Sequence, residues 1–171
     1  MLRLVTFDTS LSYKGLKTFD CGNEMINTFV KKSLKKRVKK YLSQAYILLD
    51  NNDKFVGFYT LDTFSITRET FETSNKPSGL PPIIPVVKLG MLGIDSTLQK
   101  QGIGKRLLRD AFLKVVDISK IAGCAGLYLL AEEKSIAFYE SLGFIALKNT
   151  RPLPMFLGIE VILNRENRGD R

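Results

Sequence analysis

The chain has 171 residues, 44% of them hydrophobic and 25% charged, which is the balance of a globular domain with a core of its own. Its apolar runs fall short of the roughly 18 residues of a membrane-spanning helix, and the basic-then-apolar pattern of a secretory signal is missing, so we expect a cytoplasmic protein. Two cysteines without metal-ligand spacing and no histidine argue against a zinc site, and a net charge of +9 makes a polyanionic partner worth considering.

Residues 2–7 predict a first strand, and a helix is expected over residues 24–42, with Asp20 or Asn23 available to cap it. Spacings of three and four residues place its apolar side chains on one face: Met25, Ile26, Phe29, Val30, Leu34, Val38, Tyr41 and Leu42. Cations lie between them: Lys31, Lys32, Lys35, Lys36, Arg37, Lys39 and Lys40. Because like charges at i,i+4 repel each other, this face favours binding to a nucleic-acid backbone. A merely solvated face is the alternative.

Residues 45–50 and 54–66 have the pattern of a β-hairpin, joined by an Asn-Asn-Asp turn. A proline-rich connection over residues 67–85 leads to an apolar central strand at residues 86–94. Connections of that length are often functional, so this one is a candidate for a binding loop.

A glycine turn follows the central strand, with the sequence Gln99-Lys100-Gln101-Gly102-Ile103-Gly104, and opens into a helix. Glycine lets the backbone approach a ligand closely, and the unpaired amides at a helix start attract anions. Strand, turn and helix start therefore predict a phosphate site, with Lys100, Lys105 and Arg106 as nearby cations. The third glycine of a dinucleotide fingerprint and the Gly-Lys-Ser/Thr of a P-loop are both missing. A tight loop before an amphipathic helix is the alternative.

The rest of the chain continues the alternation of helices and strands. We expect helices over residues 104–120 and 133–142, and strands over residues 127–131, 144–147 and 155–163. A helical connection makes the strand at residues 127–131 parallel to the central one. The prediction is a single α/β domain over residues 1–163, with a mixed, mostly antiparallel sheet, a central parallel pair and helices on both faces. Residues 164–171 are expected to form a charged C-terminal tail.

A second motif follows, Ser135-Ile136-Ala137-Phe138-Tyr139-Glu140-Ser141-Leu142-Gly143-Phe144. Together with the glycine turn it resembles the GNAT acetyltransferases, whose central parallel strands splay to admit acetyl-CoA. The resemblance implies an acetyl-CoA site formed by Leu92, Gly93, Ile94, Gln99, Lys100, Gln101, Gly102, Ile103, Gly104, Lys105 and Phe138. Tyr139 holds the position of the family's catalytic tyrosine, whose phenol protonates or hydrogen-bonds the departing sulfur. The alternative is that Phe138 and Tyr139 are core aromatics.

The resemblance narrows when the segments DCGNEMINTF, VGFYTL and VKLGMLGID are taken in order. This order is similar to the GNAT toxins of bacterial toxin–antitoxin pairs, which acetylate the α-amino group of the amino acid on charged tRNA. It implies aminoacyl-tRNA as substrate, held by the cations of residues 31–40, a ribbon-helix-helix antitoxin as partner, and a possible homodimer. The chain departs from those toxins at Met91, where they commonly carry arginine, and at Glu132 and Ser135, where Asn or Asp and Ala are common.

The composition also bears on the amine substrate. The chain has no histidine to act as a base. A lysine amine, with a pKa of about 10.4, stays protonated at neutral pH, whereas an α-amino group at about 7.7–8.0 is partly free. An α-amino substrate is therefore favoured, although a glutamate side chain or water could serve as the base for either amine. The alternatives are acetylation of a protein N-terminus or a small-molecule amine, and a non-catalytic module that binds acyl-CoA or nucleic acid.

Overall fold

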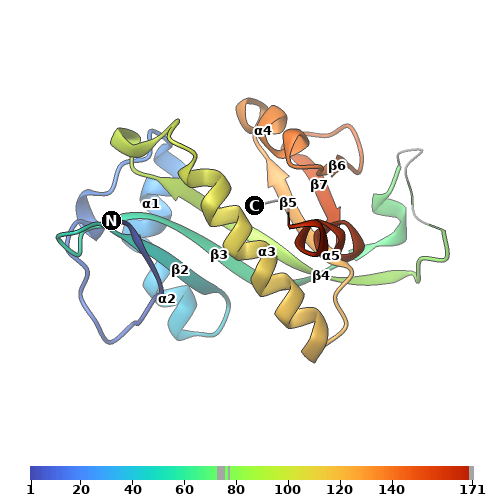
Figure 1. The fold of residues 1–171 in the computed structure, drawn as a ribbon, viewed down its shortest axis with the longest axis horizontal. Helices are drawn as coiled ribbons and strands as arrows, with labels where there is room; N and C mark the ends of the chain where they lie inside the picture. Colours follow the sequence, from blue (N-terminus) through green and yellow to red (C-terminus); the bar gives the residue numbers. More distant parts are fainter. Residues whose placement is uncertain (73–75, 77, 170–171) are drawn as a thin grey trace. The chain divides into compact units, whose positions relative to one another are not determined.

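The structure is a computed structural model, and it describes residues 1–72, 76 and 78–169. Figure 1 shows the path of the chain through its helices and strands. Seven strands form a mixed sheet in the order β1-β2-β3-β4-β5-β7-β6. The chain divides into two compact units, Met1–Asp62 with Leu89–Asp110 and Thr63–Lys88 with Ala111–Arg171. The long elements β3 (Phe55–Thr67), β4 (Ile83–Ile94) and α3 (Ile103–Ile121) run through both.

The first unit begins with antiparallel strands. β1 (Arg3–Thr6) pairs with β2 (Gln44–Leu49), which pairs with β3. Ala45 lies opposite Thr60, and Tyr46 lies opposite Tyr59. Because side chains alternate along a strand, Thr60 and Tyr59 point to opposite sides of the sheet. The predicted first strand and hairpin are confirmed.

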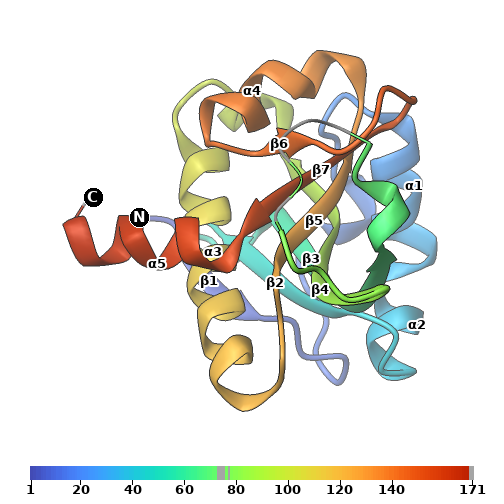
Figure 2. The same cartoon turned by 90° about the vertical axis from the view of Figure 1, so that its right-hand side faces the viewer.

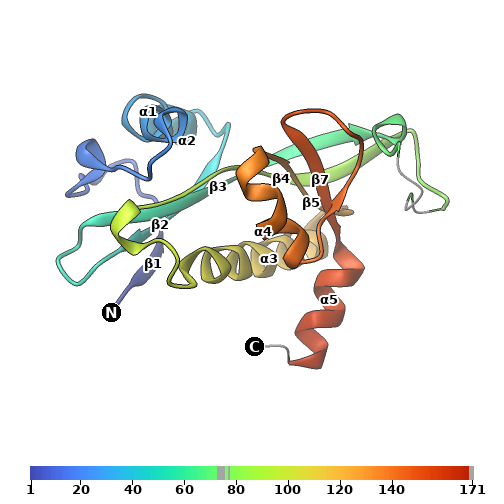
Figure 3. The same cartoon turned by 90° about the horizontal axis from the view of Figure 1, so that it is seen from above.

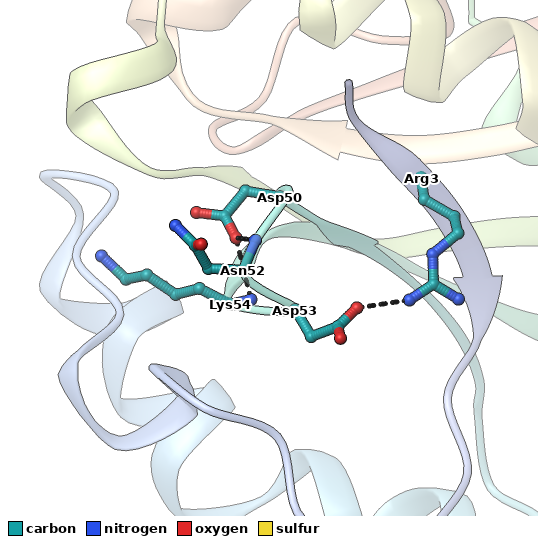
Figure 4. A network of polar contacts seen from close by, with 5 residues as sticks. All are labelled: Arg3, Asp50, Asn52, Asp53 and Lys54. Atoms are coloured by element: carbon teal, nitrogen blue, oxygen red, sulfur yellow. Dashed lines mark hydrogen bonds and ion pairs between the residues drawn. The ribbon is translucent and has the colours of Figure 1, made fainter.

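The turn between β2 and β3 is held by side chains (Figure 4). The carboxylate of Asp50 accepts hydrogen bonds from the backbone N–H groups of Asn52 at 2.8 Å and Lys54 at 3.0 Å. Asp53 pairs with Arg3 of β1 at 2.5 Å. The turn chemistry that the sequence predicted therefore also connects the hairpin to the first strand.

Two short helices replace the single helix predicted over residues 24–42. α1 spans Glu24–Lys32 and α2 spans Leu34–Lys39, with the break at Ser33. Asn23 caps α1, because its side chain accepts a hydrogen bond from the N–H of Ile26. The prediction of one helix is wrong. The periodic spacing of apolar residues continues across Ser33, and such spacing does not reveal a local change of backbone dihedral angles.

Both helices cover one face of β2 and β3 (Figure 3). Val30 and Leu34 are buried there with Phe19, Phe55 and Phe58, and three further predicted inner residues pack against this cluster: Ile26, Phe29 and Val38. The remaining predicted inner residues are exposed instead, because they lie at the helix ends or beyond them: Met25 at 58%, Tyr41 at 95% and Leu42 at 54%.

The opposite face of β3 meets the beginning of α3. Tyr59, the neighbour of Phe58, donates its hydroxyl hydrogen to the carboxylate of Asp110 on α3. Leu107 and Leu108 are fully buried on the same helix. The helix predicted over residues 104–120 is therefore confirmed as α3, and its apolar stripe is buried as expected.

The second unit contains β5 (Gly126–Ala131), β6 (Ile145–Ala146) and β7 (Leu153–Gly158). β5 runs antiparallel to β7 and parallel to β4, with Val87 opposite Leu127 and Lys88 opposite Tyr128. The predicted parallel pair is confirmed. A 3-10 turn (Glu133–Ser135) continues into α4 (Ile136–Ser141), where the sequence predicted a helix.

Two predicted boundaries in the second unit are wrong. The strand expected over residues 155–163 ends at Gly158, and α5 (Ile159–Arg168) follows it directly (Figure 2). Glu160 in the first turn and Gly169 at the left-handed C-terminal position are ordinary helix-end signals, which the apolar run concealed. β4 begins at Ile83 inside the connection predicted over residues 67–85, of which residues 73–75 and 77 lie outside the described part.

Within the described residues, no helix is long and apolar enough to cross a membrane. The same residues contain no cluster of three or more acidic, cysteine or histidine side chains suited to a metal ion.

Candidate active site

The predicted cofactor residues of the first unit lie on one continuous segment. Leu92, Gly93 and Ile94 end β4, a 3-10 turn (Ser96–Leu98) follows, and the glycine turn leads to Ile103, the first residue of α3. Asp95 shapes the crossing, since its carboxylate accepts hydrogen bonds from the N–H of Thr97 at 3.1 Å and its hydroxyl at 2.6 Å. Strand end, turn and helix start are thus brought together as predicted.

Gln99 fixes the turn to the elements around it. Its side-chain Nε2 donates to the carbonyl of Ile94 at 2.9 Å and to the carbonyl of Cys21, just before α1, at 2.7 Å. The amide of this glutamine is therefore engaged with protein backbone, and its role is to position the turn.

The turn itself has an unusual backbone. Lys100 and Gly102 both have positive φ, 60° and 78°. For Lys100 this costs roughly 1–2 kcal/mol, because a residue with a Cβ disfavours the left-handed region. A Cβ placed on Gly102 meets no atom within 4 Å, so the space in front of the turn is open. An open turn at a helix start leaves room for an anion beside the first amides of the helix.

The cations near the turn differ in their availability. Lys100 and Lys105 are exposed. Arg106 instead donates from Nη2 to the carbonyl of Leu2 on β1 at 2.9 Å, so it ties α3 to the edge of the sheet. All three side chains are exposed, and Arg106 differs from Lys100 and Lys105 in that its guanidinium is engaged by this hydrogen bond.

An irregularity in β4 precedes the predicted cofactor residues Leu92, Gly93 and Ile94. A Cβ on Gly90 would lie 2.8 Å from Oγ1 of Thr60, and one on Gly93 would lie 3.1 Å from Cε1 of Phe58. Thr60 and Phe58 share one face of β3, so Gly90 and Gly93 face the same side although they are three residues apart. A regular strand would put them on opposite sides. The N–H of Met91 also donates to Oγ1 of Thr60 at 2.9 Å, so β4 contains a bulge at Gly90–Met91.

The sequence analysis missed this bulge and the residues around it, Thr60 and Asp62. Thr60 and Asp62, two polar residues at alternate positions in the otherwise apolar first part of β3 (residues 55–62), were a signal that this face of the strand has a special environment. Bulges redirect backbone N–H groups and are frequent beside active sites, and this one lies just before the predicted cofactor residues of β4.

The predicted catalytic residue belongs to the second unit. Tyr139 lies on α4 with 9% of its surface exposed. Its ring packs edge-on against Phe138 at 5.2 Å and Phe144 at 5.5 Å between centroids. Burial, with a smaller contribution from the charge of Glu132, raises the pKa of Tyr139 to about 12. Phe138 is half-buried, so it contributes to this aromatic cluster and keeps part of its surface free.

The predicted tRNA-binding cations lie on α1 and α2. The side chains of Lys31, Lys32, Lys35, Lys36, Lys39 and Lys40 are exposed or nearly so. Arg37 differs, because its guanidinium contacts Oγ of Ser43 at 2.9 Å, the carbonyl of Leu42 at 3.4 Å and Oδ2 of Asp62 at 3.6 Å. The exposed surface is therefore made by the six lysines, which we call the lysine surface.

A mixed sheet with a central parallel pair, in which a bulged strand leads through a glycine turn into a long helix, defines an acyl-CoA-dependent transferase fold. The chain belongs to the GNAT acetyltransferase family, since the family model described as acetyltransferase (GNAT) domain matches residues 42–146. It is therefore an acetyl-CoA-dependent N-acetyltransferase.

Individual relatives are more specific. A tRNA-acetylating toxin of Mycobacterium tuberculosis (strain ATCC 25618 / H37Rv) is 25% identical over 141 residues, 82% of this chain and 83% of the relative. The solved structure of AtaT complexed with acetyl-methionyl-tRNAfMet is 33% identical with a TM-score of 0.87, covering 96% of this chain and 98% of that one. A tyrosine-to-phenylalanine variant of AtaT, bound to acetyl-CoA and the C-terminus of the antitoxin AtaR, is 33% identical with a TM-score of 0.80, covering 94% and 95%.

Proposed function

We propose that this protein transfers the acetyl group of acetyl-CoA to the α-amino group of the amino acid on charged tRNA, and thereby acts as a translation-blocking toxin. The observation that carries the proposal is the lysine surface, because it lies in the same unit as the cofactor turn. The relatives support it, since one is named for tRNA acetylation and another was solved with an acetylated aminoacyl-tRNA.

The glycine turn fits the pyrophosphate of acetyl-CoA. The space in front of Gly102 is open, the first amides of α3 have no carbonyl partner within the helix, and Lys100 and Lys105 supply positive charge. Acetyl-CoA supplies an acetyl group activated as a thioester. Backbone N–H groups from Leu92 to Ile94, just after the bulge, are proposed to polarise the thioester carbonyl and to hold the pantetheine arm.

Tyr139 is proposed as the group that protonates or hydrogen-bonds the departing sulfur. Its raised pKa keeps the hydroxyl protonated at physiological pH, so it is a donor under all the conditions in which the protein works. The family position of this tyrosine and its near-complete burial support the assignment. Phe138 is proposed to contact the cofactor with the part of its ring that remains free.

Three further proposals concern the setting of the reaction. A ribbon-helix-helix antitoxin would neutralise the protein, and the AtaT complex with the C-terminus of AtaR supports an antitoxin of some kind. A homodimer follows the pattern of the toxin family. Since charged tRNA is found in the cytoplasm, the protein is proposed to act there.

Transfer of labelled acetyl groups tests the proposal directly. Purified protein is incubated with labelled acetyl-CoA and, separately, with charged tRNA, deacylated tRNA, peptides with free N-termini, and polyamines. We expect label on charged tRNA that is released with the aminoacyl group by mild alkali. Label on peptides or polyamines, with none on charged tRNA, would contradict the proposed substrate.

A further inference from the structure

One aromatic side chain of the first unit projects into solvent beside the lysine surface. Tyr41 comes directly after Lys40, the residue that ends α2, and 95% of its surface is exposed. The other five tyrosines of the chain are buried or half-buried. The exposed phenylalanine, Phe64, differs as well, because it is 43% exposed and stacks on Tyr128. A single exposed apolar residue is ordinary on a protein surface, so exposure alone gives Tyr41 no function.

The backbone of Tyr41 has a conformation that suits glycine better than tyrosine. Its φ is 57°, in the left-handed region that a Cβ disfavours. Helices commonly place glycine or asparagine at this position after the C-cap. The hydrogen bonds are those of such a helix end: the N–H of Tyr41 donates to the carbonyl of Val38 at 3.1 Å. The N–H of Leu42 donates to the carbonyl of Arg37 at 3.0 Å. The local fold therefore does not explain why the chain has tyrosine here.

The turn that carries Tyr41 is also held by a side chain. Arg37 donates from Nη2 to the carbonyl of Leu42 at 3.4 Å and from Nε to Oγ of the buried Ser43 at 2.9 Å. The backbone on both sides of Tyr41 is thus fixed to α2, while the ring stays in solvent. A side chain that is presented by a fixed turn loses less entropy when a ligand covers it.

The surroundings of Tyr41 are cationic. Lys39 and Lys40 precede it, Lys36 lies one turn earlier on α2, and all three side chains are exposed. Residues 25–49 contain no acidic residue. Cations together with an exposed aromatic ring are typical of single-stranded nucleic-acid sites, where the cations bind phosphates and bases stack on the ring. A duplex hides the faces of its bases within the stack, so the ring indicates unpaired nucleotides.

We propose that Tyr41 stacks against an unpaired base of the nucleic acid whose phosphates the lysine surface binds. The inference rests on the proposed function for the identity of that nucleic acid as tRNA, which has unpaired bases in its loops and at its 3′ end. The lysines bind the backbone through charge, and the ring adds affinity for a base without adding charge. Stacking of this kind tolerates any base, because every base has a π-face.

The test compares two ligands that differ only in their bases. Wild-type protein is titrated with a short single-stranded RNA and with the same strand made abasic, which keeps every phosphate. We expect the RNA with bases to bind roughly 5- to 150-fold more tightly, the range for stacking of one base. Tyr41→Phe should keep this preference and Tyr41→Asn should lose it. The salt slope of Tyr41→Asn should equal that of wild type, because the lysines are unchanged.

The variants separate loss of stacking from loss of folding. Asparagine and glycine both suit the left-handed position, so Tyr41→Asn and Tyr41→Gly should be at least as stable as wild type in urea unfolding. The matched control is Ile121→Asn, which removes an apolar side chain that is 87% exposed at the end of α3. It should bind both strands as wild type does.

A fluorescence signal identifies the contact itself. The chain contains no tryptophan, so indole fluorescence of a Tyr41→Trp protein comes from this position alone. Stacking on a base quenches indole fluorescence. The RNA with bases should therefore quench the signal, and the abasic strand should not. Equal signals with the two strands would contradict stacking at this position.

The outcomes separate this inference from the proposed function. Equal affinity of wild type for the two strands, binding of neither strand, or a full preference kept in Tyr41→Asn overturns the stacking role and leaves the ring to a protein partner. Acetylation of charged tRNA would let the proposed function stand in each of these cases. A preference that Tyr41→Asn loses supports the stacking role even if charged tRNA is not acetylated, and the proposed function then fails by itself.

Discussion

At the scale of single residues, Tyr139 shows how burial determines chemistry. A phenol with a pKa near 10 in water is shifted to about 12 because its anion would lie among aromatic side chains and near Glu132. The phenol therefore stays neutral at physiological pH, where its hydroxyl can donate a hydrogen bond. The proton of the nucleophile must therefore go to a group other than this phenol.

Tyr139→Phe keeps the packing of the ring and removes the hydroxyl. Stability should change little, and acetyl transfer should fall by roughly 10²–10⁴, the contribution of one general acid. Single-turnover rates with saturating acetyl-CoA measure the effect, and thermal unfolding verifies the fold. Full activity in a folded Tyr139→Phe protein would show that the residue is only part of the core.

The same pKa shift predicts a loss of stability at alkaline pH. The folded state holds the Tyr139 proton more tightly than the unfolded chain, where the pKa is about 10. The stability from this shift is therefore complete below about pH 10 and is lost as pH rises towards 12. Urea unfolding at about pH 9 and about pH 11 should show a larger loss for wild type than for Tyr139→Phe. Equal losses would mean that Tyr139 ionises as freely in the folded protein as in the unfolded one.

A third prediction at this scale concerns the glycines of the turn. Gly104→Val adds a side chain at the second position of α3, where valine is a better helix former than glycine, so the fold should be retained. The added methyl groups enter the space expected for the pyrophosphate, and calorimetry should show weaker binding of acetyl-CoA. Gly123→Val, at an open position after α3, is the matched control. Unchanged affinity for acetyl-CoA in a folded Gly104→Val protein would contradict the assignment of the turn as the pyrophosphate site.

At the scale of elements, α1 and the cofactor turn share one support. Asn27 is buried, and its side chain donates to Oδ1 of Asp20 at 2.8 Å and accepts from the N–H of Cys21 at 2.9 Å. Gln99 of the turn bonds the carbonyl of the same Cys21. The segment before α1 is thus held between the helix and the turn. A change in α1 should therefore affect the position of the turn.

Asn27→Ala tests this coupling. Removing the amide leaves the partners of a buried bridge unsatisfied, which should lower the free energy of unfolding by roughly 1–3 kcal/mol. Affinity for acetyl-CoA should fall as well, because the anchor of Gln99 loosens. Denaturant unfolding and calorimetry measure the two effects. Thr28→Ala, one residue further along α1, is the control, and a loss of stability without any loss of affinity would limit Asn27 to the helix.

Elements with local signals could be predicted from the sequence, as could the parallel pairing of β4 and β5, but side-chain contacts between distant segments could not. The hairpin turn at Asp50, the glycine turn and α3 follow from residues close together in the chain. The break at Ser33 and the helix α5 were missed, because apolar spacing alone does not distinguish them from a continuous helix and a strand. The bulge at Gly90–Met91 depends on Thr60 of another strand, so no local pattern could have shown it.

At the scale of the whole molecule, the net positive charge is large, and its cations differ in whether they are engaged by other residues or exposed. The net charge is +9, and the lysine surface holds six of the cations on α1, on α2 and at the residue that ends α2. Arg37 stands apart, because it is occupied with Ser43, Leu42 and Asp62. The structure therefore separates one structural cation from six that are available to a polyanion, a distinction that the sequence pattern did not contain.

Replacing Lys35, Lys36, Lys39 and Lys40 with Gln keeps helix propensity and leaves the buried face of α1 and α2 unchanged. If these lysines contact tRNA phosphates, KM for charged tRNA should rise steeply, because fewer counterions are released on binding. The slope of log affinity against log salt should fall by about 3 units for four lost contacts. Acetyl-CoA affinity and acetyl transfer to a small surrogate amine should be unaffected, since neither uses the lysine surface.

The control must change the net charge equally without touching the lysine surface. Four exposed lysines elsewhere serve for this purpose: Lys17, Lys76, Lys120 and Lys134, each replaced with Gln. Long-range attraction of tRNA falls equally in both variants, so a difference between them measures direct contact at α1 and α2. A salt slope and KM that change to the same extent in both variants would show that only the overall charge matters. The lysine surface would then be a solvated face, and tRNA would have to bind elsewhere on the molecule.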